Sequence, residues 1–93
     1  MTIVNNELMA ADTRDLVKGV LNIPEGVTLI NKNVIKGNFS IKKIIIPKSV
    51  KYIGDMFALS SYALEEVVMP EEMNYVGWCF LWDCKNLKKI TIH

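Results

Sequence analysis

The side chains best suited to chemistry are two cysteines and a single histidine, Cys79, Cys84 and His93. Thiolates and imidazoles bind zinc, but a structural zinc ion needs four such ligands at characteristic spacings. Two cysteines and one distant histidine do not supply that set. A cysteine nucleophile needs a histidine base held by a third group, and we expect His93, at the end of the sequence, to be poorly held. The sequence therefore predicts buried thiols, with no metal site and no cofactor.

Paired carboxylates are the other candidates for catalysis. Glu65 and Glu66 are consecutive residues of an expected strand, so their side chains should point to opposite faces. Glu71 and Glu72 follow Pro70 in an expected turn. Neither arrangement places an acid and a base around one substrate, and the segments IGDMF and VGWCF contain single glycines rather than a phosphate-binding loop. We therefore expect no catalytic residues and no enzymatic activity.

The composition indicates one small domain without a strong charge bias. The chain has 93 residues, 51% of them hydrophobic, and a formal net charge of +1. A charge so close to zero argues against general attraction to nucleic acid or acidic membranes. No apolar run approaches the roughly 20 residues of a membrane-spanning helix, and the first residues do not resemble a signal peptide. The expected location is the cytoplasm, or the cell surface or exterior if the sequence is trimmed.

The elements that would position any site repeat with a fixed period. Pro24, Pro47 and Pro70 are spaced by 23 residues. When residues 18–40, 41–63 and 64–86 are superposed, with a partial copy at 87–93, apolar residues align in columns. Two of these columns are Leu21, Ile44, Val67 and Ile90, and Ile23, Ile46, Met69 and Ile92. Such a period is typical of solenoids, in which each unit buries its apolar face against its neighbours.

Each unit predicts a strand, a crossing segment and a return. In IKKIIIP, LEEVVMP and LKKITIH, alternating branched residues favour a short strand, which proline ends in the first two. The segments PKSVKYIG and PEEMNYVG have apolar residues at every third position and then a glycine, so they should cross the far side of the coil. DMFALSSYA and WCFLWDCKN are compact enough for one helical turn. The predicted fold is a right-handed repeat solenoid with a small parallel sheet and irregular backbone behind it.

The pattern IxIPxSVxxIG, followed by an aromatic residue, a small or cysteine position and then leucine, resembles the BspA-like leucine-rich repeat. Cys84 stands where this family usually has cysteine, and Ser61 and Asn38 occupy that position in the other units. The resemblance implies a non-enzymatic module that binds proteins or matrix. Many members are secreted or surface adhesins of bacteria and protists.

The aromatic residues of the repeat depart from the family pattern. Phe57 and Phe80 lie one residue before the usual aromatic position, where Ala58 and Leu81 stand instead. Both phenylalanines align with Val34 in the first unit, so we expect them in the core.

Residues 1–17 lie outside the repeat and predict an N-terminal cap. Asn5 or Asn6 followed by Glu7 can begin a helix. The apolar contacts of that helix would come from Leu8, Met9, Leu16 and Val17. We therefore predict a helical cap that covers the open end of the first coil, followed by the solenoid over residues 18–93.

The outward positions of the strands also align in columns. Charges alternate along Lys42, Glu65 and Lys88, and along Lys43, Glu66 and Lys89, and each such pair contributes roughly 0.2–1 kcal/mol. One interpretation is a charge ladder that sets the strand register on a solvated face. The other is a binding stripe, because branched apolar residues run beside the charges. The predicted stripe consists of Lys43, Ile45, Glu66, Val68, Lys89 and Thr91.

The last unit is rich in aromatic residues at positions that are polar elsewhere. Trp78 aligns with Asp55 and Lys32, and Trp82 aligns with Leu59 and Lys36. Exposed tryptophans indicate an interface, although they could instead fold over the open end as a makeshift cap. The last strand would also leave apolar residues beside an unpaired edge. The predicted interface consists of Trp78, Trp82, Leu87, Ile90 and Ile92.

Together these features predict a non-enzymatic protein–protein interaction module acting through the concave sheet face and the aromatic C-terminal edge. A small intracellular adaptor or inhibitor with an unidentified protein partner fits this description. The alternatives are a structural unit that forms a homodimer through its open C-terminal repeat and a secreted or surface adhesin-type domain.

Overall fold

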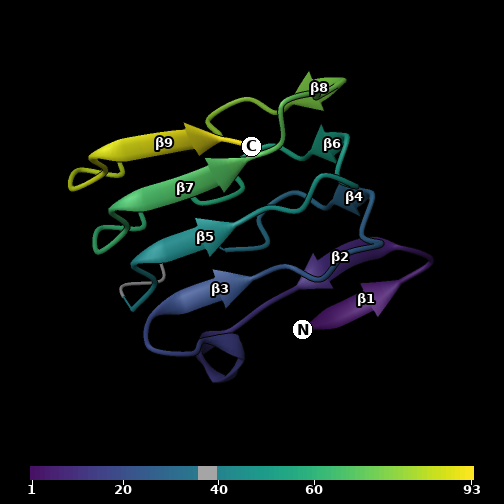
Figure 1. Cartoon of the computed structure of the whole chain (residues 1–93). Coiled ribbons are helices and arrows are strands. Elements are labelled where there is room, and N and C mark those ends of the chain that lie inside the picture. The colour runs from purple at the N-terminus through teal and green to yellow at the C-terminus, as the bar shows by residue number, and fades with distance from the viewer. Residues whose placement is uncertain (36–39) are drawn as a thin grey trace.

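The computed structural model describes residues 1–35 and 40–93 and forms a β-solenoid in which successive coils contribute strands to two sheets (Figure 1). Lys36 and Asn38, used in the alignment of the units, lie outside the described residues. The strands are β1 (Thr2–Val4), β2 (Glu7–Ala10), β3 (Val20–Asn22), β4 (Leu29–Ile30), β5 (Lys43–Ile45), β6 (Tyr52–Ile53), β7 (Glu66–Met69), β8 (Tyr75–Val76) and β9 (Lys89–Ile92), and η1 (Thr13–Asp15) is a single 3₁₀ turn.

The front sheet confirms the predicted stack of parallel strands. Its order is β3-β5-β7-β9, and Leu21, Ile44, Val67 and Ile90 pair in register. Branched residues alternate along each strand, so one set of side chains faces the core and the other faces solvent. The aligned columns of the sequence are therefore columns in space.

The expectation of irregular backbone behind this sheet was wrong. A back sheet with the order β1-β2-β4-β6-β8 lies there, and its strands from β2 to β8 are parallel. The strands β4, β6 and β8 each contain only two residues, too few to show the alternating pattern of a strand. Stacking of equivalent backbone segments, rather than a local sequence signal, creates this ladder.

Two glycines allow the coils to approach closely at the end of each back-sheet strand. A Cβ atom on Gly77 would lie 2.5 Å from the backbone of Gly54 and Asp55, and one on Gly54 would lie 2.5 Å from the backbone nitrogen of Lys32. Real side chains do not tolerate such distances from backbone atoms. The glycine in PxxVxxIG is therefore required by coil-to-coil contact.

The predicted helical turn after each glycine was also wrong. Asn33, Met56 and Cys79 adopt left-handed backbone angles, with φ of 58°, 57° and 55°. The backbone N–H of Asn33 donates to the carbonyl of Asp55 at 3.0 Å, and that of Met56 donates to the carbonyl of Trp78 at 2.8 Å. Backbone groups that a helix would pair within one turn thus bond to the next coil instead.

The core fills the space between the two sheets and the returning corner. The side chains of Leu21, Ile44 and Val67 are fully buried. At the corner, Phe57 is fully buried and its ring stacks on Phe80, with centroids 5.5 Å apart. The core position expected for the two phenylalanines is therefore confirmed.

The N-terminal cap is a β-hairpin and not a helix. Asn5 and Asn6 have φ of 50° and 65°, and two consecutive positive φ values form the tight turn that best suits a hairpin. β2 then pairs with β4 and places the fully buried Leu8 opposite Ile30. The Asn-Asn pair that suggested the start of a helix is thus the turn of a hairpin, and the cap extends the back sheet.

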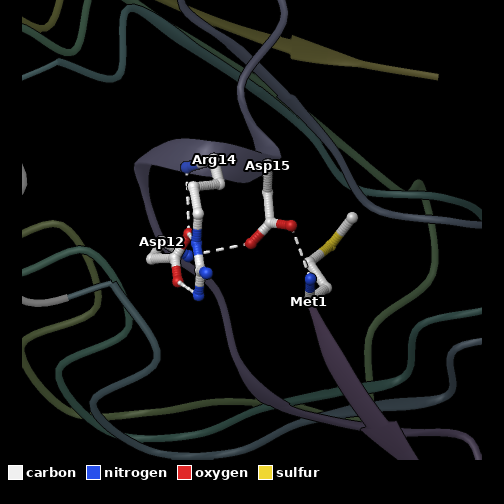
Figure 2. A network of polar contacts seen from close by, with 4 residues as sticks. All are labelled: Met1, Asp12, Arg14 and Asp15. Atoms are coloured by element: carbon white, nitrogen blue, oxygen red, sulfur yellow. Dashed lines mark hydrogen bonds and ion pairs between the residues drawn. The ribbon is translucent and has the colours of Figure 1, made fainter.

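A polar network fixes the cap to η1 (Figure 2). The amino group of Met1 forms an ion pair with Asp15. The backbone N–H of Asp12 donates to the carboxylate of Asp15 at 2.9 Å, and the guanidinium of Arg14 pairs with Asp12 at 2.8 Å. The hydrogen bond from Arg14 lowers the pKa of Asp12 to about 2, and the Met1 amino group lowers the pKa of Asp15.

Candidate functional site

The predicted binding stripe lies together on the outward face of the front sheet. Register places Lys43 beside Glu66 and Glu66 beside Lys89, and the column of Ile45, Val68 and Thr91 runs next to them. Lys89 is exposed, and the other five residues of the stripe are half-buried. The sheet therefore assembles one small surface from three strands.

Internal contacts occupy part of this surface. Lys43 Nζ lies 3.6 Å from Glu66 Oε1, and the Thr91 hydroxyl donates to Glu66 Oε2 at 3.2 Å. Glu66 thus connects three neighbouring strands, as a register-setting charge ladder would. The use of the stripe for binding stays a prediction.

The last coil leaves the core open at one end of the molecule. Ile90 is 52% exposed and Ile92 is 59% exposed, whereas their counterparts Val67 and Met69 are buried in the preceding coil. Leu87 remains half-buried against the core. Since all three positions belong to core columns, the last coil presents to solvent the face that earlier coils bury against a neighbour.

Two tryptophans extend from the same coil. Trp78 is 72% exposed and Trp82 is 63% exposed, so they do not fold over the open end as a makeshift cap. The backbone N–H of Trp78 donates to Asp55 Oδ1 at 2.8 Å, and the Tyr75 hydroxyl donates to the same oxygen at 3.2 Å. The Tyr75 pKa is raised because of this bond to the carboxylate. Asp55 therefore holds the backbone of Trp78 in place and leaves its indole in solvent.

Sequence reasoning missed the part of the open end that comes from the back sheet. Tyr75 and Val76 of β8 are exposed, and Val76 pairs with the fully buried Ile53. The alignment of Val76 with Ile30 and Ile53 was the signal that could have identified this part of the end. The apolar end of the coil therefore includes both sheets.

His93 is better held than expected. Its backbone N–H donates to the Met69 carbonyl at 3.0 Å, its carbonyl accepts from the Glu71 N–H at 3.0 Å, and its Nε2 lies 2.9 Å from the Ile46 carbonyl. The expectation of a poorly held histidine was wrong because His93, unlike proline at the equivalent position, can continue the ladder. Within residues 1–35 and 40–93, no three His, Cys, Asp or Glu side chains form a group that could hold a metal ion.

The two thiols are half-buried and not fully buried as expected. The Cys84 thiol donates to the Ala58 carbonyl at 3.1 Å, and burial raises its pKa. A thiol of raised pKa is a poor nucleophile at neutral pH. The described part of the chain also contains no helix long and apolar enough to cross a membrane.

Comparison with known proteins gives one result. The model of the BspA type leucine rich repeat region, described with 6 copies, matches residues 18–93. No curated protein and no solved structure matches the chain. The matched segment begins where the 23-residue period begins and contains every strand of the front sheet. The chain therefore belongs to the BspA-type leucine-rich-repeat family.

Proposed function

We propose that this chain binds a protein partner through its open C-terminal end. This family suggests a protein-interaction repeat module and is typically non-enzymatic. The observation that supports the location is the exposure of large apolar side chains on one coil. We define the C-terminal surface as Tyr75, Val76, Trp78, Trp82, Leu87, Ile90 and Ile92.

The physical basis of the proposal is the free energy of removing this surface from water. Burial of apolar area contributes about 25 cal/mol per Å², and an interfacial tryptophan commonly costs 2 kcal/mol or more when truncated. Trp78 and Trp82 are large side chains with only two rotatable bonds each, so their burial loses little conformational entropy. They are therefore the proposed anchors of the interface.

The outward face of the front sheet would contribute specificity more than affinity. Lys89 is the first residue of β9 and follows Lys88, so both charges lie beside Ile90 and Ile92 of the C-terminal surface. The binding stripe continues from β9 across β7 to β5. Charges at the rim of an interface mainly steer association and exclude wrong partners. A small adaptor or inhibitor, in the cytoplasm as we expect from the sequence, is the role that this arrangement suits.

Self-assembly is the second candidate, and the unpaired edge of β9 favours it. An exposed strand edge presents backbone donors and acceptors to any further strand, and here it borders the exposed Ile90 and Ile92. In this function a homodimer forms through the C-terminal repeat and no foreign protein is required.

The interaction function is tested by quantitative capture of proteins from an extract of the source cells. The native chain is compared with a variant carrying Trp78→Lys and Trp82→Lys, and with the control Val17→Lys. Val17 is 73% exposed near the opposite end, so the control changes an equally accessible apolar residue. We expect partners, including added tagged copies of the chain, to bind the native and control proteins and to be lost with the tryptophan variant. Equal binding by all three proteins would reject the proposal.

A further inference from the structure

We infer that the C-terminal surface binds a second copy of this chain, with the two β9 strands paired antiparallel about a two-fold axis. The inference rests on the proposed function and deepens it by naming the partner and the geometry. It follows from the backbone directions at the edge, from the side chains on β9 and from the charges at its two ends.

The backbone of β9 has its unused groups at two apolar residues. The N–H of Lys89 donates to the Glu65 carbonyl at 3.1 Å and the N–H of His93 donates to the Met69 carbonyl, so both residues direct their backbone toward β7. Backbone groups of successive residues in a strand point to opposite edges. The N–H and C=O groups of Ile90 and Ile92 therefore point to the free edge.

One antiparallel register satisfies these groups and covers the exposed side chains together. If the two-fold axis passes between the two Thr91 residues, Ile90 lies opposite Ile92 of the second copy, and the reverse pair forms as well. Opposed residues of an antiparallel pair exchange N–H···O=C bonds and share a face of the sheet. The outward backbone groups of both isoleucines are then paired, and their side chains cover one another on the core side.

The charges at the two ends of β9 are complementary under this symmetry. Lys88 and Lys89 stand at its start, whereas its end is bonded to Glu71 through the His93 carbonyl, with Glu72 next in the chain. Antiparallel pairing places Lys89 opposite His93 of the second copy. The backbone of that copy's Glu71 lies on the far side of its His93, about one strand spacing further away, so the long lysine and glutamate side chains meet by reaching past His93. The same contact forms twice.

These charged side chains are available for that contact. In the described part of the chain, none of Lys88, Lys89, Glu71 and Glu72 forms an ion pair. Lys48 and Lys51 line the same hollow as the two glutamates, but the Lys51 amino group bonds to the backbone carbonyl of Glu72 at 3.4 Å and not to its carboxylate.

Head-to-tail stacking lacks this complementarity. It would set the start of β9 near the N-terminal acidic residues of the next copy. There, Asp12 is paired with Arg14, and Asp15 is paired with the Met1 amino group. The observations therefore favour the two-fold pair.

Charge exchange tests the two-fold arrangement directly. One variant carries Lys88→Glu and Lys89→Glu, and a second carries Glu71→Lys and Glu72→Lys. Each variant alone places like charges together twice, so its dimer dissociation constant should rise by roughly 10- to 100-fold. A mixture of the two places opposite charges together at both contacts, so we expect it to form a heterodimer of near-native affinity. Failure of the mixture to associate while the native chain dimerises would overturn the two-fold model.

A proline substitution tests the strand pairing without relying on charge. Ile92→Pro removes an N–H that points to the free edge and leaves the bonds to β7 in place, whereas the control Ile92→Val keeps it. Light scattering should show a dimer for the native chain and for Ile92→Val, and a monomer of native circular dichroism for Ile92→Pro. A dimer that survives Ile92→Pro contradicts β9 pairing. A native chain that is monomeric up to high concentration overturns the second-copy inference alone, because capture of a foreign protein through Trp78 and Trp82 would still support the proposed function.

Discussion

The two ends of this solenoid terminate the same core in opposite ways. At the first coil, Leu21 and Leu8 are fully buried, because a hairpin extends the back sheet and Ala11 and Leu16, on either side of η1, pack against the core. At the last coil, the equivalent column reaches Ile90, which is more than half exposed. Figure 1 shows β1 and β2 beside the first coil and β9 at the far edge of the front sheet.

This difference shows where a short repeat protein can acquire function. Interior coils are equivalent, since each one buries the same columns against its neighbours. The ends differ from the interior coils, and here local residues cover the core at one end, while the other end leaves core-column residues and two tryptophans exposed. The repeat thus determines the fold, whereas we propose that the C-terminal end provides the contact surface.

The largest expected effect comes from shortening one core column at its two ends. Leu21→Ala should lower the free energy of unfolding by about 2–5 kcal/mol, because it leaves a cavity in a packed site. Ile90→Ala occupies the same column but should cost less than about 1 kcal/mol, because the side chain is already half in solvent. Urea denaturation of each monomer, at concentrations too low for self-association, measures both values. Equal losses would show that the C-terminal end is closed in solution.

A smaller difference is expected between the two stacked glycines. Gly54→Ala should destabilise the fold by about 1–3 kcal/mol, since its Cβ would meet the backbone of a coil that is itself packed on both sides. Gly77→Ala produces the same clash, but the last coil can move away into solvent, so its cost should be smaller. Thermal unfolding followed by circular dichroism compares the two variants. A greater loss for Gly77→Ala would contradict the greater freedom of the last coil.

An effect of about 1 kcal/mol is expected at the cysteine position of the repeat. Ser61 is fully buried, and its hydroxyl has no hydrogen-bond partner among the described residues. A buried hydroxyl without a partner is destabilising. We expect Ser61→Cys to raise the free energy of unfolding by about that amount, while the half-buried Cys84→Ser should lower it slightly. A loss of stability in Ser61→Cys would show that the hydroxyl has a partner in solution.

The smallest expected effect is the response of the two ends to acid. Asp12 and Asp15 have lowered pKa values in the folded protein, so their stabilisation of the cap is complete above about pH 4. It is lost as the pH falls through the lowered pKa values of the folded protein, which is about 2 for Asp12. Hydrogen exchange measured from pH 6 to 2, and normalised for its intrinsic pH dependence, should show loss of protection in β1 and β2 before β7. With Asp15→Asn, the cap should be less protected at pH 6 and its response to acid should be smaller. An acid response unchanged in Asp15→Asn would contradict this assignment.

The solenoid could be predicted because its physical cause is visible in the sequence. The 23-residue period places Leu21, Ile44, Val67 and Ile90 in one column, and any chain that buries such columns must stack its units. The same register indicated that Trp78 would be exposed, because Asp55 and Lys32 occupy its column. Both inferences depend on comparing units, which a single unit does not permit.

The hairpin, the back sheet and the corners could not be predicted as readily. Asn5 and Asn6 are compatible with a helix start or a hairpin turn, and only pairing of β2 with β4 distinguishes the two. At the corners, Met56 and Cys79 adopt left-handed angles that their residue types do not favour. At Met56 this angle directs the backbone N–H to the Trp78 carbonyl of the next coil. The missed features therefore arise from contacts between coils, whereas the predicted ones arise from periodicity within the chain.

The most direct test of the account is the solution mass of two matched variants. One carries Ile90→Lys and Ile92→Lys at the open end, and the other carries Ile3→Lys and Val4→Lys at two exposed positions of the hairpin strand β1. Light scattering over a range of concentrations should show that the native chain and the hairpin variant dimerise and that the β9 variant is a folded monomer. A dimer lost from the hairpin variant and kept in the β9 variant would contradict the account, because the contact surface would then lie at the opposite end.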